Sequence, residues 1–215
     1  MRVACMVDQT LSTLATRVQR LRVEDFDPIL NLLCENSGEI AIGAIRERSN
    51  RGLLRCRFDQ KPGRSASALD PHLNVFLRRK ALNQAKRQEE LEDQKESAWR
   101  QGNQQRLAEF REQLRALLDQ PTNANRTDIN GAISRADLYL AEPDNGWRQP
   151  TKRVLVFSSD MEDNVRAPLA PMASHAVVLV VNGSASLGGY QWLKPVRIES
   201  FSAVIRYLES YSKEN

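Results

Sequence analysis

Five oxygen-bearing side chains in three separate segments have the chemistry to bind one divalent cation together. Asp8, Thr10 and Ser12 alternate directly after an apolar run, so all three can face one point. Thr127 ends a polar segment, and Asp160 closely follows a second apolar run. Carboxylate and hydroxyl oxygens suit a small hard cation, and Mg²⁺ prefers about six such ligands, some of them water. These residues therefore predict a site for Mg²⁺, or for Mn²⁺ or Ca²⁺.

Apolar runs predict the strands that would position these residues. Strands are expected at 3–7, 39–45, 52–58, 153–157, 175–181 and 196–198. Most of these runs are continuously apolar, which indicates strands buried on both faces of a mostly parallel sheet between helices. Segment 52–58 alternates instead, and its short connection to 39–45 predicts an antiparallel edge strand. In such sheets ligands lie at the carboxyl ends of strands, where the strand order reverses.

Helical spacing is expected in four regions, at 11–33, 73–118, 128–140 and 202–211. Asp27 is expected to cap a helix that begins at Pro28. The highly charged segment 73–118 predicts an extended helix, or a helical hairpin if Gly102-Asn103 interrupts it. Residues 1–215 are thus expected to form a single α/β domain. It would have a Rossmann-like, mostly parallel sheet with one antiparallel edge strand, helices on both faces and a long helical insertion at 73–118.

The three polar segments resemble those of a von Willebrand factor A-type domain with a metal-ion-dependent adhesion site. The sequence D-x-T-x-S from Asp8 to Ser12 is similar to the D-x-S-x-S signature of that site. Residues 126–133 resemble the family's threonine loop and following helix, and residues 154–160 resemble its fourth strand and metal-site aspartate. The order of these segments matches over nearly the whole chain.

The resemblance implies a role for each residue. Thr10 and Ser12 would bind the metal directly through their hydroxyls, and Thr127 would do so in at least one state. Asp8 and Asp160 would bind directly or through water. In the family a carboxylate of a partner protein often fills a coordination position that the site leaves open. Because two acidic residues only neutralise a dication, a further anionic ligand is readily accepted. The expected function is metal-dependent protein binding, and not catalysis.

Two features depart from the family pattern. Thr10 replaces the commoner serine but keeps the hydroxyl, so coordination is retained. Met161 follows Asp160 where the family often has glycine, which predicts a different loop geometry. The stretch before Thr127 is unusually long because of the insertion.

Three alternatives remain open. Asp8, Thr10 and Thr127 could each be a helix cap, and Asp160 a turn residue. A haloacid-dehalogenase-like phosphotransferase or phosphatase also has an aspartate after its first strand. It needs a second aspartate two residues later as general acid, where this chain has Thr10. An interaction scaffold without a metal would depend on the helical insertion alone.

The helical insertion at 73–118 has two possible interpretations. Charged helices are usually solvated, in which case this segment needs no partner. As a projecting arm it would pack on a partner protein or on another copy of the chain. The residues expected to make that contact are Trp99, Leu107, Phe110 and Leu114.

The composition and the distribution of charged and apolar residues argue against several other classes of protein. The net charge of +4 comes from interspersed acids and bases, which argues against a nucleic-acid binder. No apolar run approaches the roughly 20 residues of a membrane span, and no signal peptide is expected. Cys5, Cys34 and Cys56 lack CxxC spacing and predict reduced thiols in a cytoplasmic protein. His72 and His175 lack a zinc-type pattern.

Overall fold

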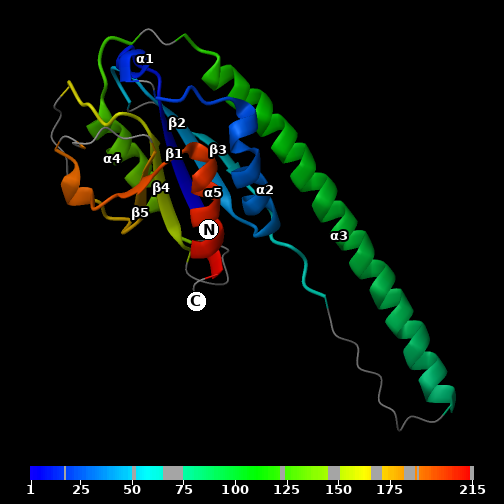
Figure 1. The fold of residues 1–215 in the computed structure, drawn as a ribbon. Coiled ribbons are helices and arrows are strands. Elements are labelled where there is room, and N and C mark those ends of the chain that lie inside the picture. Colours follow the sequence, from blue (N-terminus) through cyan, green and yellow to red (C-terminus); the bar gives the residue numbers. More distant parts are fainter. Residues whose placement is uncertain are drawn as a thin grey trace.

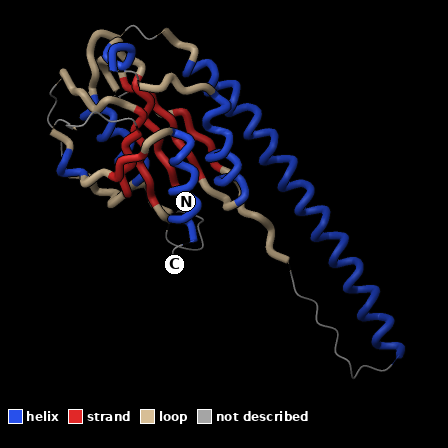
Figure 2. Tube along the Cα trace, viewed as in Figure 1, coloured by secondary structure: helices blue, strands red, loops and turns tan. Residues whose placement is uncertain are grey.

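The computed structural model describes residues 1–16, 18–49, 52–64, 75–121, 124–144, 151–165, 171–181, 187 and 189–213. The described elements gather around one sheet (Figures 1 and 2). Its strands are β1 (Arg2–Asp8), β2 (Glu39–Ile45), β3 (Leu54–Arg57), β4 (Arg153–Ser158), β5 (Val177–Val181) and β6 (Val196–Ile198). The helices are α1 (Ser12–Thr16), α2 (Asp27–Glu35), α3 (Val75–Leu118), α4 (Ile129–Leu140) and α5 (Phe201–Lys213), with short 3₁₀ helices η1 (Val23–Phe26) and η2 (Gln191–Leu193).

The strand order is β3-β2-β1-β4-β5-β6. Every neighbouring pair is parallel except β2 and β3, which confirms the mostly parallel sheet with one antiparallel edge strand. From β1 the chain first adds strands on one side and then, at β4, on the other. The adjacent carboxyl ends of β1 and β4 therefore form the switch point at which Rossmann-like sheets bind their ligands.

Alternate residues of β1 enter two separate apolar layers. Val3, Cys5 and Val7 pack with α2, α5 and the C-terminal part of α3. Ala4 and Met6 pack with α4 on the opposite face. Both layers are buried, which explains why β1 is apolar at every position and confirms that helices cover both faces of the sheet (Figure 2).

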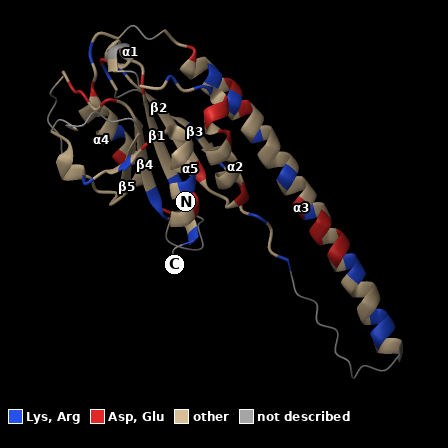
Figure 3. Cartoon of the chain, viewed as in Figure 1, with Lys and Arg blue, Asp and Glu red and all other residues tan. Residues whose placement is uncertain are grey.

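Helix α3 is continuous over 44 residues, so the helical hairpin is wrong and the extended helix is confirmed. Gly102 and Asn103 both lie inside it. A glycine costs only about 1 kcal/mol in a helix interior. Asn103 is buried, and its Oδ1 accepts a hydrogen bond of 3.0 Å from the backbone N–H of Asp59. The N-terminal part of α3 extends away from the sheet, and its charges run from basic near the tip to acidic further along (Figures 1 and 3).

Of the four apolar residues of α3 expected to contact a partner, Phe110 and Leu114 are not available for such a contact, and for these two the expectation is wrong. Phe110 and Leu114 are buried in the chain's own core, and Leu107 packs against the same cluster. Trp99 donates from its indole N–H to the carbonyl of Asp59 at 2.8 Å. The exposed large apolar side chains of α3 are instead Phe76, Leu77, Leu82 and Leu91.

Three smaller expectations are also settled. The expected helical region at 11–33 is divided into α1, η1 and α2. Asp27 is the first residue of α2 and does not cap it; Phe26 holds the cap position. The Asp27 carboxylate instead pairs with Arg111 of α3 at 2.8 Å, which ties the two helices together. His175 is exposed, and His72 lies outside the described residues.

None of the described helices combines the length and apolar character that a membrane crossing requires.

Candidate metal centre

The segment after β1 is held against the loop that precedes α4. Thr10 forms a parallel β-bridge with Ala124, and the backbone N–H of Leu11 donates to the Ala124 carbonyl at 3.0 Å. This bridge places Thr127 over the carboxyl end of β1, although the two segments are more than a hundred residues apart. Asp8 is the last residue of β1.

Three hydroxyl oxygens meet at Thr10. Its Oγ1 donates to Oδ1 of Asp8 at 2.6 Å and lies 3.0 Å from Oγ of Ser12. Oγ1 of Thr127 donates to the same Thr10 oxygen at 3.2 Å. The structure therefore brings four of the five predicted residues into one hydrogen-bonded cluster with Thr10 at its centre.

The carboxylates complete the group from β1 and β4. Asp160 lies two residues beyond the end of β4, which pairs directly with β1. Burial raises the pKa of Asp8, hydrogen bonds from Ser159 and Thr10 lower it, and the charge of Asp160 raises it further. Asp160 is therefore close enough for the two carboxylates to repel each other. Both are buried, so a nearby cation would relieve an unfavourable concentration of negative charge.

The hydroxyl spacing fits a hexacoordinate cation. Around Mg²⁺ with ligand oxygens at about 2.1 Å, adjacent octahedral ligands are about 3.0 Å apart. The separations from Thr10 to Ser12 and Thr127 are 3.0 and 3.2 Å. Hydroxyls alone supply no charge, and the two carboxylates supply the two negative charges that a dication needs. Among the described residues no group of three or more His, Cys, Asp or Glu side chains could hold a metal.

Sequence reasoning missed three polar residues around this cluster. Ser159 donates to Oδ2 of Asp8 at 2.6 Å, and Thr16 donates to Oδ2 of Asp160 at 3.0 Å. Asn164 accepts from the backbone N–H of Thr127 at 2.7 Å through its side chain. Ser159 had a visible signal, since it directly precedes Asp160, whereas Thr16 and Asn164 are identified only by the folded contacts.

Gln9 joins the cluster to the rest of the fold. It lies between Asp8 and Thr10 and is buried. Its Nε2 donates to the carbonyl of Leu117 in α3 at 3.0 Å, and its Oε1 accepts from Nε of Arg46 at 3.0 Å. The segment that carries the candidate ligands is thus fixed to both α3 and the turn after β2.

The residue after Asp160, Met161, has a backbone conformation that glycine adopts most readily. Its φ is 61°, in the left-handed region. Its side chain is buried in the apolar layer around α4. This packing offsets a backbone strain of order 1–3 kcal/mol.

No protein-family model and no curated protein matches this chain. The arrangement of its own side chains is therefore what bears on its function.

Asp128, next to the candidate ligand Thr127, caps α4. Its Oδ1 accepts from the backbone N–H of Gly131 at 2.7 Å, and its Oδ2 accepts from that of Ser49 at 2.9 Å. We expect Asp128→Ala to lower the free energy of unfolding by about 2 kcal/mol, since it removes a cap and leaves a buried N–H without its acceptor. Urea denaturation measures this loss. Ser134→Ala on the exposed face of α4 is the control, and an equal loss in both variants would contradict the role of the cap.

Proposed function

We propose that this chain is a von Willebrand factor A-type domain whose metal-ion-dependent adhesion site binds a divalent cation and, through it, a carboxylate of a partner protein. The observation that carries the proposal is the meeting of three hydroxyls and a carboxylate around Thr10 at the switch point of the sheet. Thr10, Ser12 and Thr127 would hold the cation through their hydroxyls, with Asp8 and Asp160 direct or through water. When bound, the cation would supply an electrophilic centre for an anionic group.

The exposure of the site supports binding from one side. Asp8, Thr10, Thr127 and Asp160 are all buried, whereas Ser12 is half-buried. The neighbouring Leu11 is 43% exposed and lies beside Ser12 in the sequence. We propose that a partner approaches over Leu11 and Ser12 and covers this leucine when it reaches the cation.

The same residues favour binding over phosphoryl transfer. A phosphotransferase of the haloacid-dehalogenase type would need an acid two residues after Asp8. Thr10 holds that position, and its hydroxyl already donates to Asp8. A hydroxyl is far too weak an acid to protonate a leaving group at neutral pH. We therefore propose no enzymatic activity. The free thiols of Cys5, Cys34 and Cys56 are consistent with a cytoplasmic location, which we propose as well.

Manganese binding tests the proposal directly. Titration of the protein into Mn²⁺, followed by electron paramagnetic resonance, is expected to remove the signal of the free aqueous ion with one ion per chain. Thr127→Val deletes one hydroxyl at nearly constant volume and is expected to weaken binding roughly tenfold or more. Ser134→Ala, remote from the site, should bind like wild type. Added acetate is expected to lower the water-proton relaxation of the bound ion by displacing water. Failure of millimolar Mn²⁺ to bind wild-type protein would overturn the proposal.

A further inference from the structure

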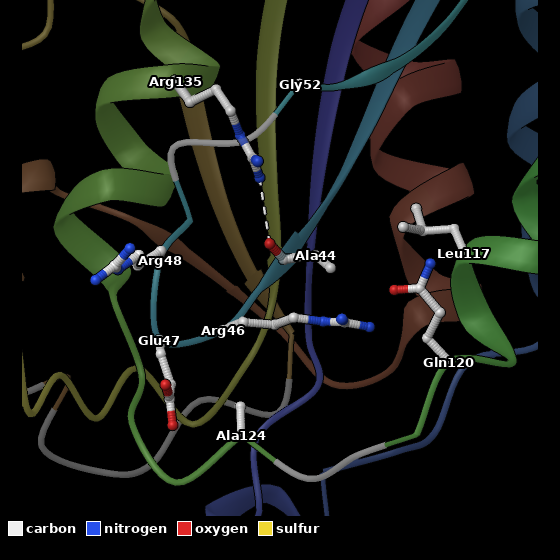
Figure 4. A pocket seen from close by; sticks show the side chains of 9 residues that line it. All are labelled: Ala44, Arg46, Glu47, Arg48, Gly52, Leu117, Gln120, Ala124 and Arg135. Atoms are coloured by element: carbon white, nitrogen blue, oxygen red, sulfur yellow. Dashed lines mark hydrogen bonds between the residues drawn. The ribbon is translucent and has the colours of Figure 1, made fainter.

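A cavity lined by several charged residues lies beside the candidate metal centre. It has a volume of about 640 Å³ and lies between the turn after β2, the C-terminal end of α3 and α4. Arg46 and Arg48 come from the turn, and Arg135 comes from α4 (Figure 4). Guanidinium groups bind carboxylates and phosphates through charge-assisted hydrogen bonds, so three arginines around one cavity favour an anionic ligand.

Arg135 is held over the sheet by a specific feature of β2. Its Nη2 donates to the carbonyl of Ala44 at 3.3 Å (Figure 4). A side chain at Gly43 would place its Cβ 2.2 Å from that same nitrogen, so the glycine provides the space in which the guanidinium lies. Burial lowers the pKa of Arg135 to about 10, against the opposing charge of Asp128. The group remains cationic at neutral pH and would be stabilised by an anion.

Two acidic residues beside these arginines, Glu47 and Asp128, accept hydrogen bonds from backbone N–H groups. Oε1 of Glu47 accepts from the N–H of Asn125 at 3.3 Å. Asp128, which faces Arg135, accepts from Ser49 and Gly131 as described above. Of the described charged residues that line the cavity, three are arginines and one is Glu47. The cavity retains a net positive charge and can accept a further carboxylate.

The cavity and the metal centre share one wall. Ala124 lines the cavity, and it is the residue that pairs with Thr10. Arg46 also lines the cavity and binds Gln9, the residue between Asp8 and Thr10. A ligand that reaches the candidate cation is therefore within a few residues' length of the arginines.

We infer that the cavity lined by Arg46, Arg48 and Arg135 binds a second acidic side chain of the protein segment whose first carboxylate reaches the metal. The inference rests on the proposed function for the first contact, but the second contact needs no metal. An extended acidic peptide suits this arrangement because the two binding points are connected through Ala124 and Gln9 and would both prefer carboxylates. The partner would carry at least two acidic residues close together in its sequence.

A fluorescently labelled hexaglutamate peptide is a suitable probe, with binding followed by anisotropy in Mg²⁺ and in chelator. Wild-type protein is expected to bind the peptide in both conditions, and more tightly with Mg²⁺. The double variant Arg48→Gln/Arg135→Gln is expected to lose roughly tenfold in affinity in both conditions. Arg48→Glu alone alters only an exposed residue, cannot compromise the core, and is expected to lose affinity in the same way.

Two controls separate the inference from its alternatives. Arg79→Gln/Lys80→Gln removes the same charge from the tip of α3 and is expected to leave binding within twofold of wild type. Equal losses in the two double variants would overturn the inference in favour of non-specific attraction. Stoichiometric binding of inorganic phosphate without binding of the peptide would also overturn it and assign the cavity to a phosphate ligand. If wild-type protein binds the peptide equally well in Mg²⁺ and in chelator, the result would contradict the proposed function but would still support peptide binding in the arginine cavity.

Discussion

Mg²⁺ at a hundredfold excess over its Kd is expected to raise the melting temperature by roughly 5–11 °C. A ligand at that ratio stabilises the folded state by about 2.7 kcal/mol, and each kcal/mol shifts Tm by about 2–4 °C in a domain of this size. Burial of Asp8 and Asp160, whose charges repel each other, favours a low Kd, so this ratio should be reached at a modest Mg²⁺ concentration. Differential scanning calorimetry in Mg²⁺ and in chelator measures it.

Asp8→Asn is the matched variant, since it keeps the size of the side chain and removes its charge. We expect it to abolish the Mg²⁺ increment while the chelated protein still unfolds cooperatively. An undiminished increment in Asp8→Asn would show that the cation binds elsewhere. An increment absent from wild type would show that the hydroxyl cluster is only structural.

Acid is expected to reduce this increment. The pKa of Asp8 in the folded chain is raised above its ordinary value of 3.8, mainly by burial. Between 3.8 and the raised value the folded state holds a proton that the unfolded chain has lost. The chelated protein therefore gains stability as the pH falls through the raised pKa and loses it as the pH rises. Mg²⁺ favours the ionised carboxylate, so protons compete with it over that range and the difference between the two Tm values shrinks.

Leu114→Ala is expected to lower the free energy of unfolding by about 2–5 kcal/mol. Leu114 is fully buried where α3 packs against the sheet, so truncation removes apolar burial and leaves a cavity. Leu91→Ala makes the same chemical change on the same helix, where the leucine is 50% exposed. It is expected to change stability by no more than about 0.5 kcal/mol. Urea denaturation of both variants compares them directly.

The pair of variants separates two parts of one helix. A large loss for Leu114→Ala alone would establish that the C-terminal part of α3 belongs to the core and that its N-terminal part does not. Comparable losses in both variants would mean that the projecting part packs against something in solution.

Much of the sheet is predictable because burial on both faces demands apolar residues at every position. The expected strands at 153–157 and 175–181 correspond to β4 and β5, which are buried along most of their length. The continuity of α3 was not predictable in the same way. Gly102-Asn103 locally favours a break, and the bond that stabilises Asn103 comes from Asp59, which is 44 residues away.

The candidate site was also predictable from the sequence only in part. Asp8 and Asp160 could be placed from sequence because each follows an apolar run and parallel strands bring their carboxyl ends together. The role of Thr10 as the shared centre of the hydroxyls follows only from the bridge to Ala124. The final turns of α3 carry an apolar stripe that is visible in the sequence. Such a stripe can pack against a partner protein or against the chain's own sheet, and the sequence does not distinguish the two. Phe110 and Leu114 pack against the chain's own core.

The hydrogen bond from Gln9 to the carbonyl of Leu117 connects the long helix α3 to the segment that carries the candidate ligands. At 1.5 Å per residue, its 44 residues form a rod about 66 Å long, with one end fixed beside the candidate ligands and the other far out in solvent. Because the rod is unbroken, a load applied at its tip acts on the part of α3 that packs in the core at Phe110 and Leu114, and the final turn continues directly from that part. That turn cannot slide along its axis without stretching the bond to Gln9, and with it the segment from Asp8 to Thr10. The long helix of this molecule is thus connected, through Leu117 and Gln9, to the segment that carries the candidate ligands.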